Sequence, residues 1–161
     1  MKMGTRAIHI LCRYGFPYID ILQALVDNGA ALNLQDNYGF SAFAIMASHP
    51  YVQLSADLVS KWIHEHGLDL SIKTNLGATP LVNAIASQSL HGLSAILPNI
   101  AGHVDLSAEL DSAKIKLQEI ANLKPIPEDL HALARLANAR QIVDLLEARC
   151  SQQCLRTLAG R

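Results

Sequence analysis

Hydrophobic residues recur at helical spacing in two segments of the chain that share one layout. In residues 19–29, positions 19, 21, 22, 25 and 26 are apolar and form one face of a predicted helix. Asn28-Gly29 ends this helix, because glycine adopts the left-handed conformation of a helix C-cap without a steric clash. Residues 58–67 follow the same pattern. A second glycine stands at the same distance after each turn, so we predict a repeated helix–turn–helix unit: Gly39 follows Gly29, and Gly77 follows Gly67.

A short apolar helix is predicted after each of these turns. Ser41 precedes residues 42–47 and is suited to cap a helix there. Thr79-Pro80 combines a hydroxyl N-cap with a proline at the first helical position of residues 80–86, where the missing N–H of proline costs nothing. Small side chains in both segments let neighbouring helices approach one another closely.

The stretch Gly77-Ala78-Thr79-Pro80-Leu81-Val82-Asn83-Ala84 resembles the ankyrin repeat, whose period is about 33 residues and whose signature is T-P-L-H-x-A. Val82 departs from that signature by taking the place of its histidine. Residues 39–46 form a looser copy, and residues 4–11 keep the histidine as His9 but lack Thr-Pro. The resemblance implies that His9 and His131 are structural histidines that hydrogen-bond neighbouring turns.

The repeat is not strictly regular. Its anchor glycines, Gly4, Gly39 and Gly77, are spaced by 35 and 38 residues. We place the extra residues between the two helices of a unit, at 16–18 and 48–54, because loops accept insertions at little entropic cost. The resemblance holds from residue 4 to about residue 87 and is weaker beyond it.

The resemblance implies an all-α fold: an ankyrin-like solenoid of stacked antiparallel helix pairs joined by short β-turn or hairpin loops. We assign residues 1–161 to a single ankyrin-repeat domain, with repeats over 4–105 and degenerate C-terminal capping helices over 106–161. Solenoids need atypical terminal repeats to close the stack, so a capping repeat reaching to about residue 150 is expected.

Two segments make up the predicted cap. Residues 107–123 have the pattern of an amphipathic helix, and residues 128–150 are predicted to form two helices. The candidate core positions of the first segment are Leu110, Ile115, Leu117 and Ile120.

Composition narrows the function classes. The 161 residues suit one ordinary domain, and a formal net charge of −1 leaves no basic stripe for nucleic acid. Hydrophobic residues make up 50% of the chain but aromatic ones only 5%, which suits close-packed helices better than a β-sandwich. The mean hydropathy of +0.19 predicts apolar surface that a partner covers.

Targeting signals are not evident in the sequence. The apolar stretch 7–12 is too short for a signal-peptide core, and no stretch approaches the roughly 18 apolar residues of a membrane span. Three cysteines are too few and too odd in number for a disulfide framework. We therefore expect a reduced cytoplasmic protein without a membrane partner; secretion into a host cell cannot be judged from these features.

For three candidate chemical sites, a structural role is the favoured interpretation. His64 and His66 are two residues apart and point in different directions on a helix, without the H-E-x-x-H zinc pattern. Cys150 and Cys154 share a helix face but lack a second ligand pair. Cys12 with His9 is conceivable as a nucleophile and base, yet Cys12 occupies a small packing position. We therefore expect no catalytic, metal or cofactor residues and no enzymatic activity.

The expected function is binding of another protein through turn tips and the concave face of the inner helices, where ankyrin proteins usually meet their partners. Tyr38 and Phe40 stand out, because aromatic side chains dominate binding hot spots. Local packing against the next turn is the alternative for Phe40 and Leu76. Carried over by position, with the inserted loop included, the predicted binding residues are Asn37, Tyr38, Phe40, Ser48, Tyr51, Asn75, Leu76, Ala78 and Ser87.

Two further functions stay open at this stage. The first helix begins with little polar shielding from Met1 and Met3, so this end packs on another copy or protein, or the chain is a fragment; we favour the fragment. The chain would then be the targeting domain of a larger multidomain enzyme, such as a bacterial effector, with catalysis outside it. A self-contained hydrolase or metal protein that uses cysteine and histidine is the weaker alternative.

Overall fold

The computed structural model describes residues 7–14, 19–100, 106–122 and 130–159, and this part of the chain is mostly helical. It contains no β-strand, and its isolated β-bridge joins Gln35 to Ser41. The predicted all-α class is therefore confirmed. The chain divides into two compact units, residues 1–99 and 100–161. The assignment of 1–161 to a single domain stays a prediction.

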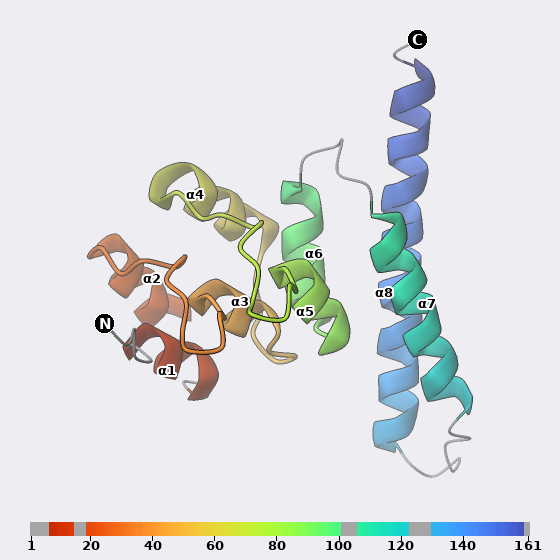
Figure 1. Cartoon of the computed structure of the whole chain (residues 1–161), viewed down its shortest axis with the longest axis horizontal. Helices are drawn as coiled ribbons and strands as arrows, with labels where there is room; N and C mark the ends of the chain where they lie inside the picture. The colour runs from red at the N-terminus through yellow and green to blue at the C-terminus, as the bar shows by residue number, and fades with distance from the viewer. Residues whose placement is uncertain (1–6, 15–18, 101–105, 123–129, 160–161) are drawn as a thin grey trace. The chain divides into compact units, whose positions relative to one another are not determined.

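Three helix pairs build the first unit (Figure 1). The first helix of each pair contacts the first helix of the next, so α3 lies against both α1 and α5, and α4 contacts α6. The pairs are α1 (Ala7–Tyr14) with α2 (Ile19–Asp27), α3 (Ala42–Ala47) with α4 (Ala56–His66), and α5 (Pro80–Ala86) with α6 (Leu90–Ile96), which continues into the short 3₁₀ helix η1 (Leu97–Asn99).

Side-chain caps fix where these helices begin. The hydroxyl of Ser41 accepts a hydrogen bond from the amide of Ala44, and Thr79 caps α5 in the same way ahead of Pro80, as predicted. Ser55 caps α4, which therefore begins at Ala56, two residues before the predicted start. Because these hydroxyls satisfy amides that lack an intrahelical partner, each helix has a defined first turn.

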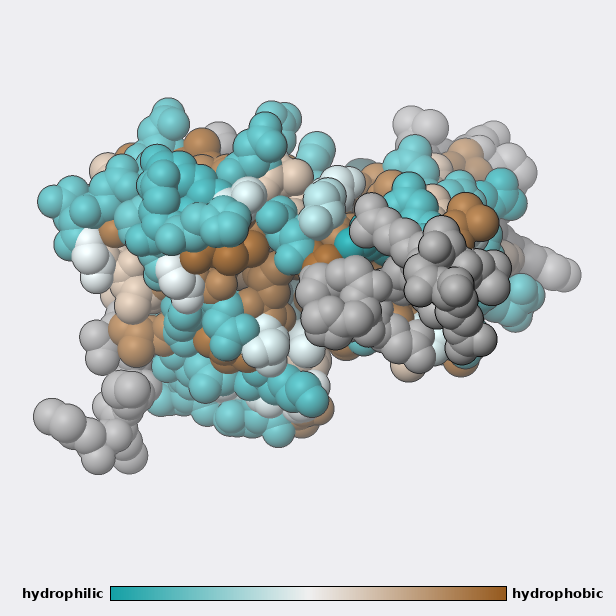
Figure 2. Space-filling view, turned by 90° about the horizontal axis from the view of Figure 1, so that it is seen from above, coloured by the Kyte–Doolittle hydropathy of each residue, from teal (hydrophilic) through white to brown (hydrophobic). Residues whose placement is uncertain are grey.

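The core of the first unit lies between the helix pairs. All six residues of α3 are buried, and the ring of Phe43 meets the ring of Trp62 edge to face at 6.4 Å between centroids. The indole N–H of Trp62 donates to Gln23 Oε1 at 2.7 Å, which links α4 to α2. Viewed from above, hydrophobic side chains of this unit lie between two bands of hydrophilic ones (Figure 2).

The second unit pairs α7 (Ser107–Asn122) with α8 (Leu130–Ala159). Lys114 Nζ and Glu147 Oε1 form an ion pair at 2.8 Å between the two helices. The prediction of two helices over 128–150 is wrong, because residues 130–159 form one continuous helix. The segment contains neither glycine nor proline, so nothing in its backbone chemistry interrupts the helix.

The predicted core face of α7 is only partly correct. Ile120 is buried and Leu110 and Leu117 are half-buried, but Ile115 is 63% exposed. Ala113 is buried instead. Residues two positions apart on a helix point in different directions, so a face that contains Ala113 cannot also contain Ile115. Residues 16–18, where the sequence predicted an insertion, lie outside the described residues.

Candidate protein-binding surface

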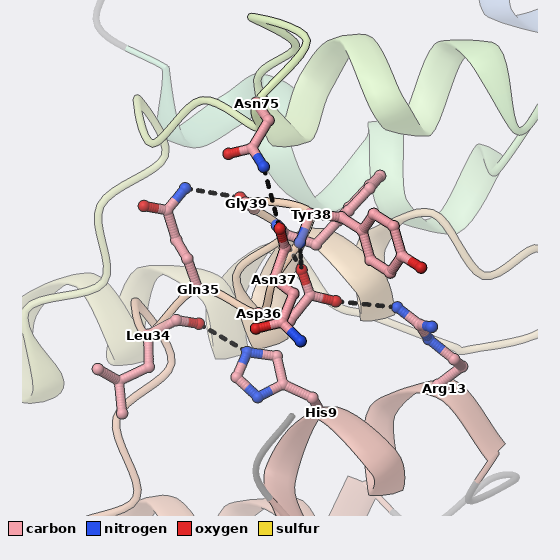
Figure 3. A network of polar contacts seen from close by, with 10 residues as sticks. His9, Arg13, Leu34, Gln35, Asp36, Asn37, Tyr38, Gly39 and Asn75 are labelled. Carbon is pink, nitrogen blue, oxygen red and sulfur yellow. Dashed lines mark hydrogen bonds and ion pairs between the residues drawn. The ribbon is translucent and has the colours of Figure 1, made fainter. Parts of the chain in front are cut away.

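The turn before α3 is organised by the carboxylate of Asp36 (Figure 3). Its Oδ1 accepts hydrogen bonds from the amides of Tyr38 at 2.9 Å and Phe40 at 3.0 Å. Its Oδ2 pairs with Arg13 Nη2 of α1 at 3.0 Å, and the Asp36 side chain is only 1% exposed. Gly39 completes the turn at φ +80°, a conformation that favours glycine. The Asp36 carboxylate thus fixes the backbone of the turn and ties it to the preceding helix.

The turn before α5 repeats this geometry with a different residue in the organising position. Thr74 Oγ1 accepts a hydrogen bond from the amide of Ala78 at 3.2 Å, and the Thr74 amide donates to the Ala78 carbonyl at 2.9 Å. Gly77 takes the same left-handed conformation, at φ +81°. The two turns are therefore built alike although their organising side chains differ.

Direct hydrogen bonds join the two turns at their tips. The Asn75 amide donates to the Tyr38 carbonyl at 3.1 Å, and Asn75 Nδ2 donates to the Asn37 carbonyl at 3.1 Å. Gln35 Nε2 contacts the carbonyls of Gly39 at 2.6 Å and Lys73 at 2.8 Å. We call the joined tips the turn ridge, defined by Asn37, Tyr38, Asn75 and Leu76.

Two more contacts hold the turns in place. The side chain of His9, which is buried in α1, forms a hydrogen bond from Nε2 to the Leu34 carbonyl at 2.8 Å, so the predicted contact of His9 with a neighbouring turn is confirmed. Farther along, Asn33 Nδ2 donates to the Gly67 carbonyl at 2.7 Å, and Asn33 Oδ1 accepts from the Asp69 amide at 3.0 Å. The loops of successive helix pairs are thus linked at two places, at the turn tips and at Asn33.

The side chains of the turn ridge remain at the surface. Tyr38 is 66% exposed and Leu76 is 94% exposed, and Asn37 and Asn75 are exposed as well. Local packing, the alternative considered for Leu76, is wrong, because a side chain exposed to this extent has almost no contact with the next turn. The ridge therefore presents one aromatic, one aliphatic and two amide side chains to solvent on a rigid backbone.

The remaining predicted residues have different surroundings. Tyr51 is 69% exposed in the loop between α3 and α4, while Phe40 and Ala78 are half-buried. Ser48 and Ser87 follow α3 and α5, and their hydroxyls donate to Ala44 and Asn83 carbonyls at 2.7 and 2.8 Å. These two hydroxyls already serve their own helices.

Four residues that organise the ridge were missed from the sequence: Arg13, Gln35, Asp36 and Thr74. Asp36 and Thr74 had a readable signal, because aspartate and threonine side chains form turns with the amides that follow them, and each stands three residues before a turn glycine. Arg13 pairs with Asp36, 23 residues away along the chain, and Gln35 joins the two turns through the Lys73 carbonyl, 38 residues away. Such distant pairings are not visible in local sequence patterns.

The pKa values of two side chains in the first unit, Asp69 and Cys12, are shifted from their ordinary values. Hydrogen bonds from the Ser71 hydroxyl and amide to the Asp69 carboxylate lower the pKa of that carboxyl. Burial raises the pKa of the Cys12 thiol to about 12. A thiol with that pKa stays protonated at neutral pH, and the protonated form is a poor nucleophile. The Cys12 side chain is itself buried, at 8% exposure, in agreement with the packing position that the sequence predicted.

The other candidate chemical residues are spread over the molecule. His64 is exposed at the end of α4, and His66 Nε2 lies 3.4 Å from Asp27 Oδ1. Cys150 is half-buried on α8, where His131 is exposed; the side chain of Cys154 lies outside the described residues. Within the ranges that the structure describes, no group of three or more histidine, cysteine, aspartate or glutamate side chains is placed to hold a metal ion.

Comparisons with known proteins add no relative: no protein-family model matches the chain, and no curated protein matches it. Among the helices described, none combines the length and the apolar character needed to cross a membrane.

Proposed function

We propose that this chain is a non-catalytic protein-binding module of the ankyrin-repeat type, and that it binds a partner protein through the turn ridge and the adjoining inner-helix face. The observation that carries the proposal is the pair of hydrogen bonds from Asn75 to the carbonyls of Asn37 and Tyr38. They hold two tips together while leaving the Tyr38 and Leu76 side chains exposed.

Rigid presentation is what makes these side chains suited to binding. A tyrosine supplies a large contact area and has few rotatable bonds, so little conformational entropy is lost when it is covered. The backbone around Tyr38 is already fixed by Asp36, so binding need not order it. The repeat type is supported by the sequence signature at Thr79-Pro80-Leu81 and by the buried His9, which bonds to the following turn.

The test uses peptides selected on the immobilised protein from a random displayed library. Their dissociation constants are then measured by fluorescence anisotropy for the unaltered protein and for the double variant Tyr38→Ala/Leu76→Ala. Truncating a hot-spot tyrosine costs about 2 kcal/mol, which corresponds to roughly 30-fold weaker binding. We expect at least this loss for the double variant.

Ile115→Ala is the matched control, because Ile115 is 63% exposed, close to the 66% of Tyr38, but lies in the second unit. The control is expected to bind like the unaltered protein, and both variants should keep the helical circular dichroism signal. The proposal fails if selection yields no binding peptide, or if peptides bind the double variant as tightly as the unaltered protein.

A further inference from the structure

The charged residues of the first unit are distributed unevenly between its two kinds of segment. The inner segments hold the first helix of each pair and the turns before α3 and α5: residues 1–14, 33–48 and 71–89. The outer segments hold the second helix of each pair: residues 19–32, 49–70 and 90–99. The inner segments contain four basic residues and one acidic residue, whereas the outer ones contain one basic residue and five acidic residues. The turn ridge therefore belongs to the positively charged part of the unit.

The acidic side chains of the outer segments are all exposed. They lie on α2, on α4 and in the loop after α4: Asp20, Asp27, Asp57, Glu65 and Asp69. Lys61, the basic residue of these segments, lies 3.8 Å from Glu65. The outer helices thus present negative charge to solvent, and a partner of the same sign is repelled there.

Asp36, the acidic residue of the inner segments, does not present its carboxylate to solvent. Its side chain is 1% exposed, and its two oxygens accept hydrogen bonds from the turn amides and from Arg13. The Arg13 side chain is itself 37% exposed. A guanidinium has five N–H donors, so Arg13 can bind a partner carboxylate while it keeps Asp36. Figure 3 shows the Tyr38 ring and the Arg13 guanidinium on the same side of Asp36.

Lys73 is a second cation, next to the other tip of the ridge. It is exposed, stands two residues before Asn75, and its carbonyl accepts a hydrogen bond from Gln35 at 2.8 Å. In the part of the chain that the structure describes, the ammonium group of Lys73 forms no ion pair. The other basic residues of the inner segments, Lys2 and Arg6, lie outside the described residues.

We propose that the partner of the turn ridge is an acidic protein segment, in which aspartate or glutamate stands beside an apolar side chain. The inference rests on the proposed binding function and names the chemistry of the partner. The carboxylates of the segment meet Arg13 and Lys73, while its apolar side chain covers Tyr38 and Leu76. Because the outer helices repel the same segment, charge also selects the side of the unit that is engaged.

Nucleic acid fits this surface less well than an acidic protein segment does. A phosphate backbone is bound through many basic side chains, and the described residues around the ridge supply two. The exposed Tyr38 and Leu76 side chains also match an apolar side chain of a protein. An oligothymidylate probe is nevertheless included in the test, because its phosphates have the same sign of charge.

Three displayed peptide libraries that differ only in charge test the inference on the whole chain. Each library keeps the same random apolar positions and fixes the positions between them as acidic, as neutral polar or as basic. Dissociation constants of the selected peptides are measured by fluorescence anisotropy at about 50 and about 500 mM NaCl. The tightest binders should come from the acidic library, and their binding should weaken roughly 5-fold at high salt, because salt screens exposed charge pairs.

Lys73→Glu reverses the unpaired charge beside the ridge. It should slow association of the acidic peptides roughly 10-fold, since charges at the rim of an interface act mainly on the association rate. Lys61→Glu is the matched control, because it reverses the charge of another exposed lysine and changes the net charge of the chain equally, but lies on α4. Stopped-flow fluorescence measures both rates, and circular dichroism verifies that both variants are folded. The library and salt measurements need no variant.

Three results would overturn the inference: neutral or basic peptides that bind as tightly as acidic ones, equal association rates for Lys73→Glu and Lys61→Glu, or tighter binding of oligothymidylate than of the acidic peptides. The last result would make nucleic acid the partner. Failure of the proposed binding function looks different. In that case no library yields a binder, or the double variant Tyr38→Ala/Leu76→Ala binds every selected peptide unchanged, and the inference falls with it.

Discussion

Gly39 offers the sharpest test of how the two turns are joined. A Cβ atom at this position would lie 2.5 Å from the Asn75 amide nitrogen, 2.6 Å from Asn75 Oδ1 and 3.0 Å from the Thr74 carbonyl carbon. Two of these three atoms belong to the backbone of the next turn, which cannot yield as a flexible side chain does. Gly39→Ala must therefore push the tip of the second turn away from the first.

The cost of this substitution has two parts. An alanine at φ +80° is disfavoured by about 1 kcal/mol relative to glycine. Displacing the tip also weakens the two hydrogen bonds that Asn75 makes to Asn37 and Tyr38, each worth about 1 kcal/mol. The free energy of unfolding should therefore fall by about 3 kcal/mol.

Gly77→Ala separates the two parts. Gly77 has φ +81°, but a Cβ there meets nothing within 4 Å. This variant therefore has the backbone cost alone, about 1 kcal/mol. Urea unfolding followed by circular dichroism yields both free energies, and their difference measures the tip-to-tip contact. If the two variants lose the same stability within about 0.5 kcal/mol, the hydrogen bonds between the tips do not stabilise the fold, and the reasoning is refuted.

Three further predictions concern the core. Leu81→Ala should cost roughly 2–5 kcal/mol in urea unfolding, because Leu81 is 5% exposed; a loss below about 1 kcal/mol would place it outside the core. Gly92→Ala should destabilise by about 1–3 kcal/mol although alanine favours helices, since its Cβ would overlap the Ala47 carbonyl oxygen; a stabilised variant would contradict this. Cys12 should resist iodoacetamide in the folded protein at alkaline pH, which peptide mass mapping can check. Burial raises the pKa of the Cys12 thiol above its value of about 8.5 in the unfolded chain. The free energy of unfolding is therefore unaffected by this thiol below about pH 8.5 and decreases as the pH rises further, by less than about 1 kcal/mol at pH 9. The variant Cys12→Ala should not show this decrease.

Local signals in the sequence were sufficient for most of the first unit. Short-range chemistry is enough to predict the helix starts at Ser41 and Thr79-Pro80 and the positive φ of the helix-ending glycines Gly29 and Gly67. Each depends on residues within a few positions of one another. Patterns of that range can be read without knowing the tertiary structure.

Two predictions for the second unit were wrong. Residues 128–150 were divided into two helices to match a helix pair, although no glycine or proline separates them, and the structure has the single helix α8. Ile115 was placed in a core stripe, yet the contact of α7 with α8 selects Ala113 and Ile120. Helical periodicity offers several overlapping faces, and only the position of the partner helix decides between them.

The exposed residues of the candidate surface could be predicted from the sequence, but the hydrogen bonds that hold the surface together could not. Exposed aromatic and aliphatic residues at the tips could be read from Tyr38 and Leu76. The hydrogen bonds that join the tips could not, because Asn75 and its partners are 37 or 38 residues apart. Their pairing depends on how two helix pairs stack, which no local pattern contains.

The construction of the ridge separates the residues that hold the fold from those that are available for binding. The side chains of Asp36 and Thr74 accept hydrogen bonds from backbone amides of the two turns, and both residues are buried. The side chains of Tyr38 and Leu76 contribute little to that arrangement, since most of their surface faces solvent. Substitutions at these two positions can therefore change what the ridge binds without changing how it folds. Loops that are held by a rigid scaffold and present replaceable side chains are where proteins commonly place recognition.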